Sequence, residues 1–259
     1  NAEQPGAEEL VEAADVVEGC RAVGFTTQTP GLSMVGVVDD LLVDRAFVAE
    51  RATTAAEIGS IEDTGSIPTR HIVANALAAA ALARAAGVSP EAVRDGLRAY
   101  RPGEHRIQLV AESDGVRWIN DSKATNPHAA QASLSAFDSV VWIAGGDVKG
   151  ADLGPLVAAA ADRLVGVVLL GLDPAPFTEA LSRHAPEVPV RRIDPGETDD
   201  VAARTRLMED AVHAARSLAV AGDVVLLAPA AASIDQFRDY AERGDLFAAA
   251  VTRLPGEHA

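Results

Sequence analysis

The second part of the chain alternates short apolar runs with longer segments of helical composition, and this alternation constrains the fold most. Runs such as VRWI, VVWIA, GVVLLG and DVVLLA are rich in Val, Ile and Leu, which is typical of buried parallel strands. We predict strands at 107–112, 116–120, 139–144, 165–170, 188–193 and 223–228, and helices at 127–137, 152–163, 175–184, 201–220 and about 234–252. Strands that alternate with helices form βαβ units, so the sequence predicts an α/β fold with a mostly parallel, Rossmann-like sheet.

The first part of the chain has a different order of predicted helices and strands. We predict a short helix within 4–14, a strand at 22–27 and a hairpin over 34–50 that turns at the Asp-Asp pair, followed by strand and loop. An Ala-rich helix then runs from His71 to Gly87, and a second helix starts after Ser89 with Pro90 at its first position. The segment RPGEHR breaks this pattern. We therefore predict two α/β domains, 1–101 and 102–259.

Composition limits the partners of the chain. Its formal net charge of -16 repels nucleic acid and anionic membranes, so we expect neither as a partner. The single cysteine, Cys20, permits no internal disulfide, and no apolar run reaches the roughly 18 residues of a membrane span. No signal peptide is recognisable either, so we expect a cytoplasmic protein. The chain begins at Asn1 rather than Met, which we interpret as a possible fragment.

Three polar clusters follow predicted strands: NDSKATN (120–126), GGDVKG (145–150) and PAAASIDQFRDY (229–240). Ligands of such sheets bind beyond the carboxyl ends of the strands. Each cluster also has a purely structural explanation. Asn126 and Pro127 are suited to begin a helix, GGDVKG is typical of a flexible turn and lacks the spacing of a phosphate-binding P-loop, and Ser233 could simply cap a helix. In the functional alternative for the third cluster, Ser233 and the amides at that helix start would hold a carboxylate.

Taken together, the clusters resemble a known family. The order HxxxN, HR, NDSKATN, GGDxK and PAxAS-x-DQF is similar to that of the Mur ligases, in particular the branch that joins D-glutamate to UDP-N-acetylmuramoyl-L-alanine. The resemblance runs from about residue 65 to 250, and NDSKATN discriminates this branch from its sisters. The sequence departs from the family pattern at Ile72, Glu104, Ala231 and Tyr240, and Ile72 weakens the match at the adenine site.

The resemblance implies a three-domain enzyme, of which this chain would hold the later part of the central ATPase domain and the whole C-terminal domain. The upstream P-loop, the uridine site and the Mg²⁺ ligands are absent from the sequence, so no metal site is expected in this chain. The implied catalytic residues are Lys123 and Lys149. The implied D-glutamate contacts are Thr125, Lys149, Ser233 and Tyr240. The implied ATP contacts are Asn75, Arg106, Asp121 and Lys123, and which ligand Lys123 meets stays open.

The family reaction would use ATP and Mg²⁺ to phosphorylate the carboxylate of UDP-N-acetylmuramoyl-L-alanine, and the amine of D-glutamate would attack the acyl phosphate. Such chemistry requires orientation and neutralisation of negative charge. We expect a monomer that is inactive as this chain alone. A sister ligase of the folylpolyglutamate synthase type, or a non-catalytic module that binds a nucleotide or an amino acid, stays open as an alternative. A nicotinamide dehydrogenase is excluded because no G-x-G-x-x-G follows a strand.

Overall fold

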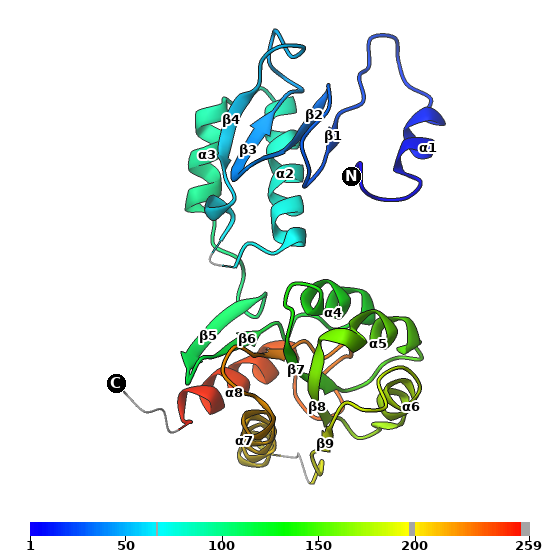
Figure 1. Ribbon diagram of the computed structural model, residues 1–259, viewed down its shortest axis with the longest axis vertical. Coiled ribbons are helices and arrows are strands. Elements are labelled where there is room, and N and C mark those ends of the chain that lie inside the picture. The colour runs from blue at the N-terminus through cyan, green and yellow to red at the C-terminus, as the bar shows by residue number, and fades with distance from the viewer. Residues whose placement is uncertain (66, 197–199, 255–259) are drawn as a thin grey trace. The chain divides into compact units, whose positions relative to one another are not determined.

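The computed structural model describes residues 1–65, 67–196 and 200–254. The chain divides into two compact units, Asn1–Pro102 and Gly103–Ala259, which we call unit 1 and unit 2. Each unit has its own sheet (Figure 1). Each also has its own hydrophobic core. The roles predicted for the two domains stay predictions.

Unit 1 contains a four-stranded sheet in the order β1-β2-β3-β4. Its strands are β1 (Gly24–Phe25), β2 (Met34–Val38), β3 (Leu41–Asp44) and β4 (Ala56–Ser60). β2 and β3 are antiparallel and join at Asp39 and Asp40, which confirms the predicted hairpin. The left-handed backbone of Asp39 (φ 54°) makes the tight turn, a conformation that Asp tolerates better than most residues.

Three α-helices complete the described part of unit 1: α1 (Ala7–Glu12), α2 (Arg70–Ala85) and α3 (Pro90–Ala99). The Ser89 side chain accepts a hydrogen bond from the amide of Ala92, so the predicted cap of α3 is confirmed. A short 3-10 turn, η1 (Glu62–Thr64), follows β4. The core packs Val73 and Leu77 of α2 and Val93 of α3 against the buried side chains of the sheet.

Unit 2 contains the predicted six strands, arranged in the order β5-β6-β10-β7-β8-β9. They are β5 (Gln108–Ser113), β6 (Val116–Asn120), β7 (Val140–Gly145), β8 (Leu164–Leu170), β9 (Val190–Arg192) and β10 (Val224–Leu227). All neighbours are parallel except β5 and β6, which are antiparallel. The chain therefore returns at its end to insert β10 between β6 and β7, which makes this part of the sheet the point where strand order reverses.

Helices cover both faces of this sheet (Figure 1). α7 (Val201–Leu218) and α8 (Tyr240–Thr252) pack on one face, where Trp118 contacts Phe247. α4 (Pro127–Leu134), α5 (Gly154–Ala160) with the 3-10 turn η2 (Ala161–Arg163), and α6 (Ala175–His184) cover the other, where Trp142 contacts Phe177. Burial on both faces explains why the strand sequences are continuous apolar runs rather than alternating ones.

One predicted helix starts later than expected. The sequence predicts a helix from about residue 234 with Ser233 as its cap, but residues 234–239 form turns and α8 begins at Tyr240. Asp239 is the cap, and its side chain accepts a hydrogen bond from the amide of Glu242. Serine and aspartate both favour cap positions, so the prediction chose the first of two suitable residues and was wrong. No helix N-terminus is therefore available at Ser233 to hold a carboxylate.

Candidate functional site

The three polar clusters lie at one edge of the sheet of unit 2. They leave the carboxyl ends of β6, β10 and β7, which are adjacent in the sheet. We call these segments the β6 loop (residues 121–126), the β10 loop (residues 228–239) and the β7 loop (residues 146–153). Neighbouring strands lie about 4.8 Å apart, so the starts of the β6 and β7 loops are only about 10 Å from each other. The fold thus brings together residues that are far apart in the sequence.

Hydrogen bonds between backbone groups connect the three loops. In the β10 loop, the amide of Ala230 donates to the carbonyl of Ala124 in the β6 loop at 2.9 Å. Ala232 exchanges two bonds with Asp147 of the β7 loop, at 2.9 and 3.0 Å. Because each loop is held by its neighbour, their positions depend on one another.

The DQF motif of the β10 loop has a structural role in the same edge. The side-chain oxygen of Gln236 accepts a hydrogen bond from the amide of Gly171, at 2.6 Å, directly after β8. Asp235 accepts another from the amide of Leu172 at 3.1 Å. These bonds extend the connected edge from β6 to β8.

The backbone at this edge adopts conformations that few residues tolerate. A Cβ on Gly146, where φ is 122°, would come within 2.1 Å of the carbonyl oxygen of Ala232, so only glycine fits. Non-glycine residues with left-handed backbone also gather here, namely Ile107 (φ 46°), Lys149 (φ 51°) and Ala230 (φ 59°). Such strain persists only where the surrounding structure enforces it, and it concentrates at functional sites.

Asp121 is the first residue after β6 and is buried. Its carboxylate accepts hydrogen bonds from the Ser133 hydroxyl and, at 3.4 Å, from the amide of Ile107. Burial raises the pKa of Asp121, and it outweighs the opposing effects of these hydrogen bonds and of the Arg106 charge. Both carboxylate oxygens are therefore engaged, and only their remaining lone pairs can accept from a ligand.

Lys123 lies in the middle of the β6 loop and is half-buried. Its ammonium nitrogen is 3.7 Å from the centre of the Tyr240 ring, a cation–π contact. Tyr240 in turn meets His105 edge-to-face, with ring centres 6.2 Å apart. The structure thus places Lys123 beside Tyr240, and the ligand that each would contact stays a prediction.

The other predicted D-glutamate residues lie on the same three loops. Thr125 is half-buried in the β6 loop, Ser233 is buried in the β10 loop, and Lys149 is exposed on the β7 loop. Lys123 and Lys149 are the only two lysines of the chain, and both occur at this edge. The loops also carry aspartates, such as Asp121 and Asp147, so the two lysines offer individual cationic contacts rather than a positively charged surface.

The predicted ATP contacts divide between the units. Arg106 is exposed, just before β5, and its charge acts on Asp121. Asn75 is exposed on α2 of unit 1. Its predicted contact with adenine stays a prediction.

Sequence reasoning missed several polar residues beneath these loops. Asn120, the last residue of β6, is fully buried and contacts both His105 and the carbonyl of Gly244. Arg243 is buried and binds two of the loops. Arg243 stands in α8 between other charged residues, Glu242 and Asp245, and arginines are mostly solvent-exposed, so the sequence offered no signal for its burial.

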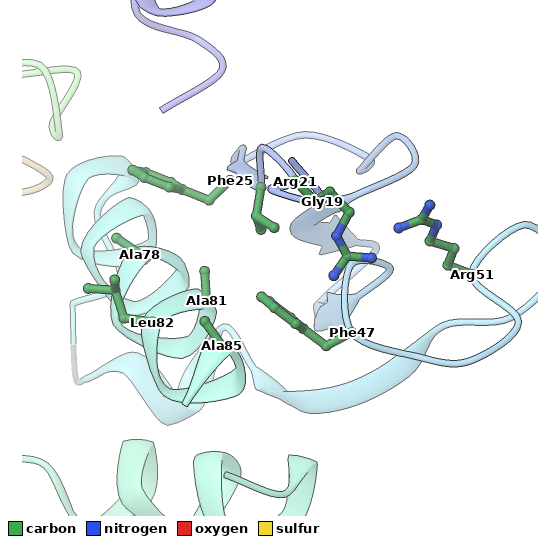
Figure 2. Close-up of a pocket in the computed structure, with 10 residues that line it drawn as sticks. Gly19, Arg21, Phe25, Phe47, Arg51, Ala78, Ala81, Leu82 and Ala85 are labelled. Atoms are coloured by element: carbon green, nitrogen blue, oxygen red, sulfur yellow. The ribbon is translucent and has the colours of Figure 1, made fainter. Parts of the chain in front are cut away.

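A separate apolar groove of about 820 Å³ lies in unit 1, beside α2 (Figure 2). Its lining residues are Gly19, Arg21, Val23, Phe25, Phe47, Arg51, Ala78, Ala81, Leu82 and Ala85. None of the predicted site residues belongs to it. Within the described residues, no cluster of His, Cys, Asp and Glu could hold a metal ion, and no helix is both long and apolar enough to cross a membrane.

Comparisons with known proteins agree with this architecture. The family model for the "Mur ligase, glutamate ligase domain" matches residues 105–231, which include the β6 and β7 loops. A pseudomurein peptide ligase type C from Methanothermus fervidus has a similar fold, with a TM-score of 0.53 at 15% identity, over 85% of this chain and 42% of that one. A murein peptide ligase from Psychrobacter arcticus also has a TM-score of 0.53 at 15% identity, over 90% of this chain and 47% of that one.

The fold, the connected strand-end loops and the family match define a glutamate ligase domain of the Mur type, and the chain belongs to the Mur ligase family. Two of its curated relatives bear the name UDP-N-acetylmuramoylalanine–D-glutamate ligase. The one from Streptomyces avermitilis is 59% identical over 98% of this chain and 53% of its own length. That of Mycobacterium tuberculosis is 47% identical over 92% of this chain and 52% of its own. The chain spans about half the length of the curated relatives it matches.

Proposed function

We propose that the protein to which this chain belongs joins D-glutamate to UDP-N-acetylmuramoyl-L-alanine at the expense of ATP, a step of peptidoglycan precursor synthesis. The observation that carries the proposal is the convergence of the β6, β10 and β7 loops, with both lysines of the chain among them. The curated relatives, which bear the name of this activity, support it.

D-glutamate carries two carboxylates and one amine, and the loops offer complementary groups. Lys149 supplies a cation, while the hydroxyls of Thr125, Ser233 and Tyr240 supply donors. Lys123 is held against the Tyr240 ring, and its charge would neutralise the acyl phosphate or a substrate carboxylate. In this proposal the chain's residues orient the amine of D-glutamate and lower the repulsion between anions.

The nucleotide would lie on the Asp121 side of the site. Arg106 is exposed and can meet an anion, and Asp121 retains lone pairs that can accept from a ribose hydroxyl. ATP, when bound, supplies the phosphoryl group that activates the acceptor carboxylate. The family resemblance implies that the Mg²⁺ ligands lie outside this chain, so none of its residues is assigned to the metal. A monomeric, cytoplasmic protein without nucleic-acid or membrane partners stays a prediction from charge and composition.

Substitution of Lys149 in the full-length ligase tests the amino-acid site. We expect Lys149→Ala to lower kcat/KM for D-glutamate by about 10- to 100-fold, because a charge-assisted hydrogen bond contributes about 1.5–3 kcal/mol. Arg191→Ala is the matched control, since Arg191 is an exposed cation on β9 at the far side of the same sheet. Equal kinetics for the two variants would remove Lys149 from the site.

The nucleotide side is tested with Asp121→Asn, which keeps the side-chain volume and removes the charge. We expect a higher KM for ATP and little change in the KM for D-glutamate. An unchanged KM for ATP would remove the ribose role of Asp121.

The choice of amino acid is a separate test. Product formation is measured with D-glutamate, L-glutamate and L-alanine in parallel. Turnover of another amino acid in preference to D-glutamate would favour a sister ligase.

A further inference from the structure

Arg243 occupies an unusual position in unit 2. It lies in the first turns of α8 and is only 1% exposed. Its guanidinium donates to the Ser122 hydroxyl and the Ser122 carbonyl, both at 3.0 Å, and twice to the Ala231 carbonyl at 3.3 Å. One side chain therefore binds two segments that are more than a hundred residues apart in the sequence.

Burial of this charge is costly. All four acceptor contacts are neutral oxygens, and no carboxylate in the described part of the chain forms an ion pair with Arg243. Burial lowers the pKa of Arg243 to about 9, although the charge of Asp235 opposes this effect. A buried apolar side chain often stabilises a fold at less cost, so packing alone gives no reason for a cation at this position.

The two segments that Arg243 binds are the β6 and β10 loops. Ser122 stands between Asp121 and Lys123, and its hydroxyl also donates to the Tyr240 carbonyl at 2.7 Å. Ala231 lies two residues before Ser233. The guanidinium thus sits directly behind the residues that carry the predicted ligand contacts.

We propose that Arg243 is a positioning residue that sets the spacing between the β6 and β10 loops, so that Lys123, Thr125 and Ser233 can contact one dicarboxylate ligand together. The identity of that ligand rests on the proposed function. The link that Arg243 makes between the two loops rests on its hydrogen bonds alone. Arg243 does not touch the reacting atoms in this proposal; it acts through Ser122 and Ala231.

The geometry requires arginine rather than lysine. Arginine presents donors along several fixed directions in one plane, and here they reach a hydroxyl and two carbonyls on different loops. Lysine would keep the charge but concentrate its donors at one point. Arg243→Lys therefore removes the hydrogen bonds that link the two loops but keeps the positive charge.

The experiment compares Arg243→Lys with Arg253→Lys, an exposed arginine on the turn that ends α8. In the full-length ligase we expect Arg243→Lys to raise the KM for D-glutamate at least tenfold, with a smaller change in kcat, and Arg253→Lys to change neither. In the 259-residue chain, we expect the backbone amide NMR signals of residues 121–125 and 230–236 to shift in Arg243→Lys, while those of β8 and β9 stay in place.

Ser122→Ala is the second variant, because it removes one acceptor of Arg243 and keeps the buried cation. We expect shifts in the same two loops and a smaller rise in the KM for D-glutamate. If the loop signals did not shift in either folded variant, the proposal that Arg243 holds the two loops would be overturned. If the signals shifted while the kinetics stayed as in wild type, its role in ligand binding would be overturned. If the wild-type enzyme failed to ligate D-glutamate, the proposed function would be wrong. The NMR comparison would still test whether Arg243 holds the two loops.

Discussion

The two units solve the problem of burying apolar surface in different ways. Unit 2 covers both faces of its sheet with helices, and its two tryptophans, Trp118 and Trp142, are fully buried, one towards each face. Unit 1 has a smaller core, although single apolar side chains are exposed in both units, such as Leu82 of α2 at 74% and Ile234 of the β10 loop at 67%. Because a larger core buries more apolar surface, packing should contribute more to the stability of unit 2 than to that of unit 1.

Removal of a large side chain from the core of unit 2 should have the largest effect. We expect Trp118→Ala to destabilise unit 2 by about 3–5 kcal/mol, because it removes buried area and leaves a cavity next to Phe247. Urea unfolding followed by the fluorescence of Trp142 measures this, since both tryptophans belong to unit 2. The protection of the amides of unit 1 against hydrogen exchange should not change. A matching loss of protection in unit 1 would mean that the units do not unfold independently.

Unit 1 should be most sensitive at a buried ion pair. Asp44 is fully buried, binds Arg84 at 2.8 Å and accepts from the amides of Ala46 and Phe47. We expect Asp44→Asn to destabilise unit 1 by about 3 kcal/mol, because Arg84 loses its partner in a poorly solvated place. Hydrogen exchange of β3 and α2 measures the loss.

The matched control for this pair is Arg216→Gln in unit 2, which breaks the half-exposed pair with Asp114. Exposed ion pairs contribute about 0–1 kcal/mol, so we expect almost no change. Equal effects of the two substitutions would show that burial does not distinguish the pairs.

The acid stability of unit 1 should depend on Glu3. Burial would raise the pKa of Glu3, but hydrogen bonds from Thr26, Thr27 and Arg70 outweigh it and lower the pKa to about 2. The stabilisation from the ionised carboxylate is therefore complete above about pH 4.5 and is lost as the pH falls towards 2.

Thermal melts of wild type and Glu3→Gln, followed by hydrogen exchange of β1, measure this dependence. We expect their difference in melting temperature to be largest above pH 5 and to shrink below pH 4, because the glutamine side chain of the variant cannot ionise. A constant difference across this range would contradict the assignment.

The smallest effect should come from the exposed face of α2. We expect Leu82→Gln to change the free energy of unfolding by less than about 0.5 kcal/mol, since its side chain is mostly in water already. Leu77→Ala, at a fully buried position of the same helix, should cost about 2–5 kcal/mol. Similar costs for both would mean that Leu82 is packed in solution.

The pattern of apolar runs was enough to predict all six strands of unit 2 and the hairpin of unit 1, because buried strands and caps are encoded locally. The cap at Asn126 with Pro127 was predicted for the same reason and is confirmed by the bond from Ala129. Ser233 shows the limit: local preference cannot choose between two suitable caps when tertiary contacts hold the intervening turn, as those of Asp235 and Gln236 do.

The sequence by itself determined the fold class, the family and which polar residues stand at strand ends. Only the tertiary structure decided that β10 enters between β6 and β7, and so which loops are neighbours. It also decided that the Arg243 guanidinium lies beneath two of them, out of water. Strand order and burial arise from contacts between distant segments, and neither is written in the periodicity of any one of them.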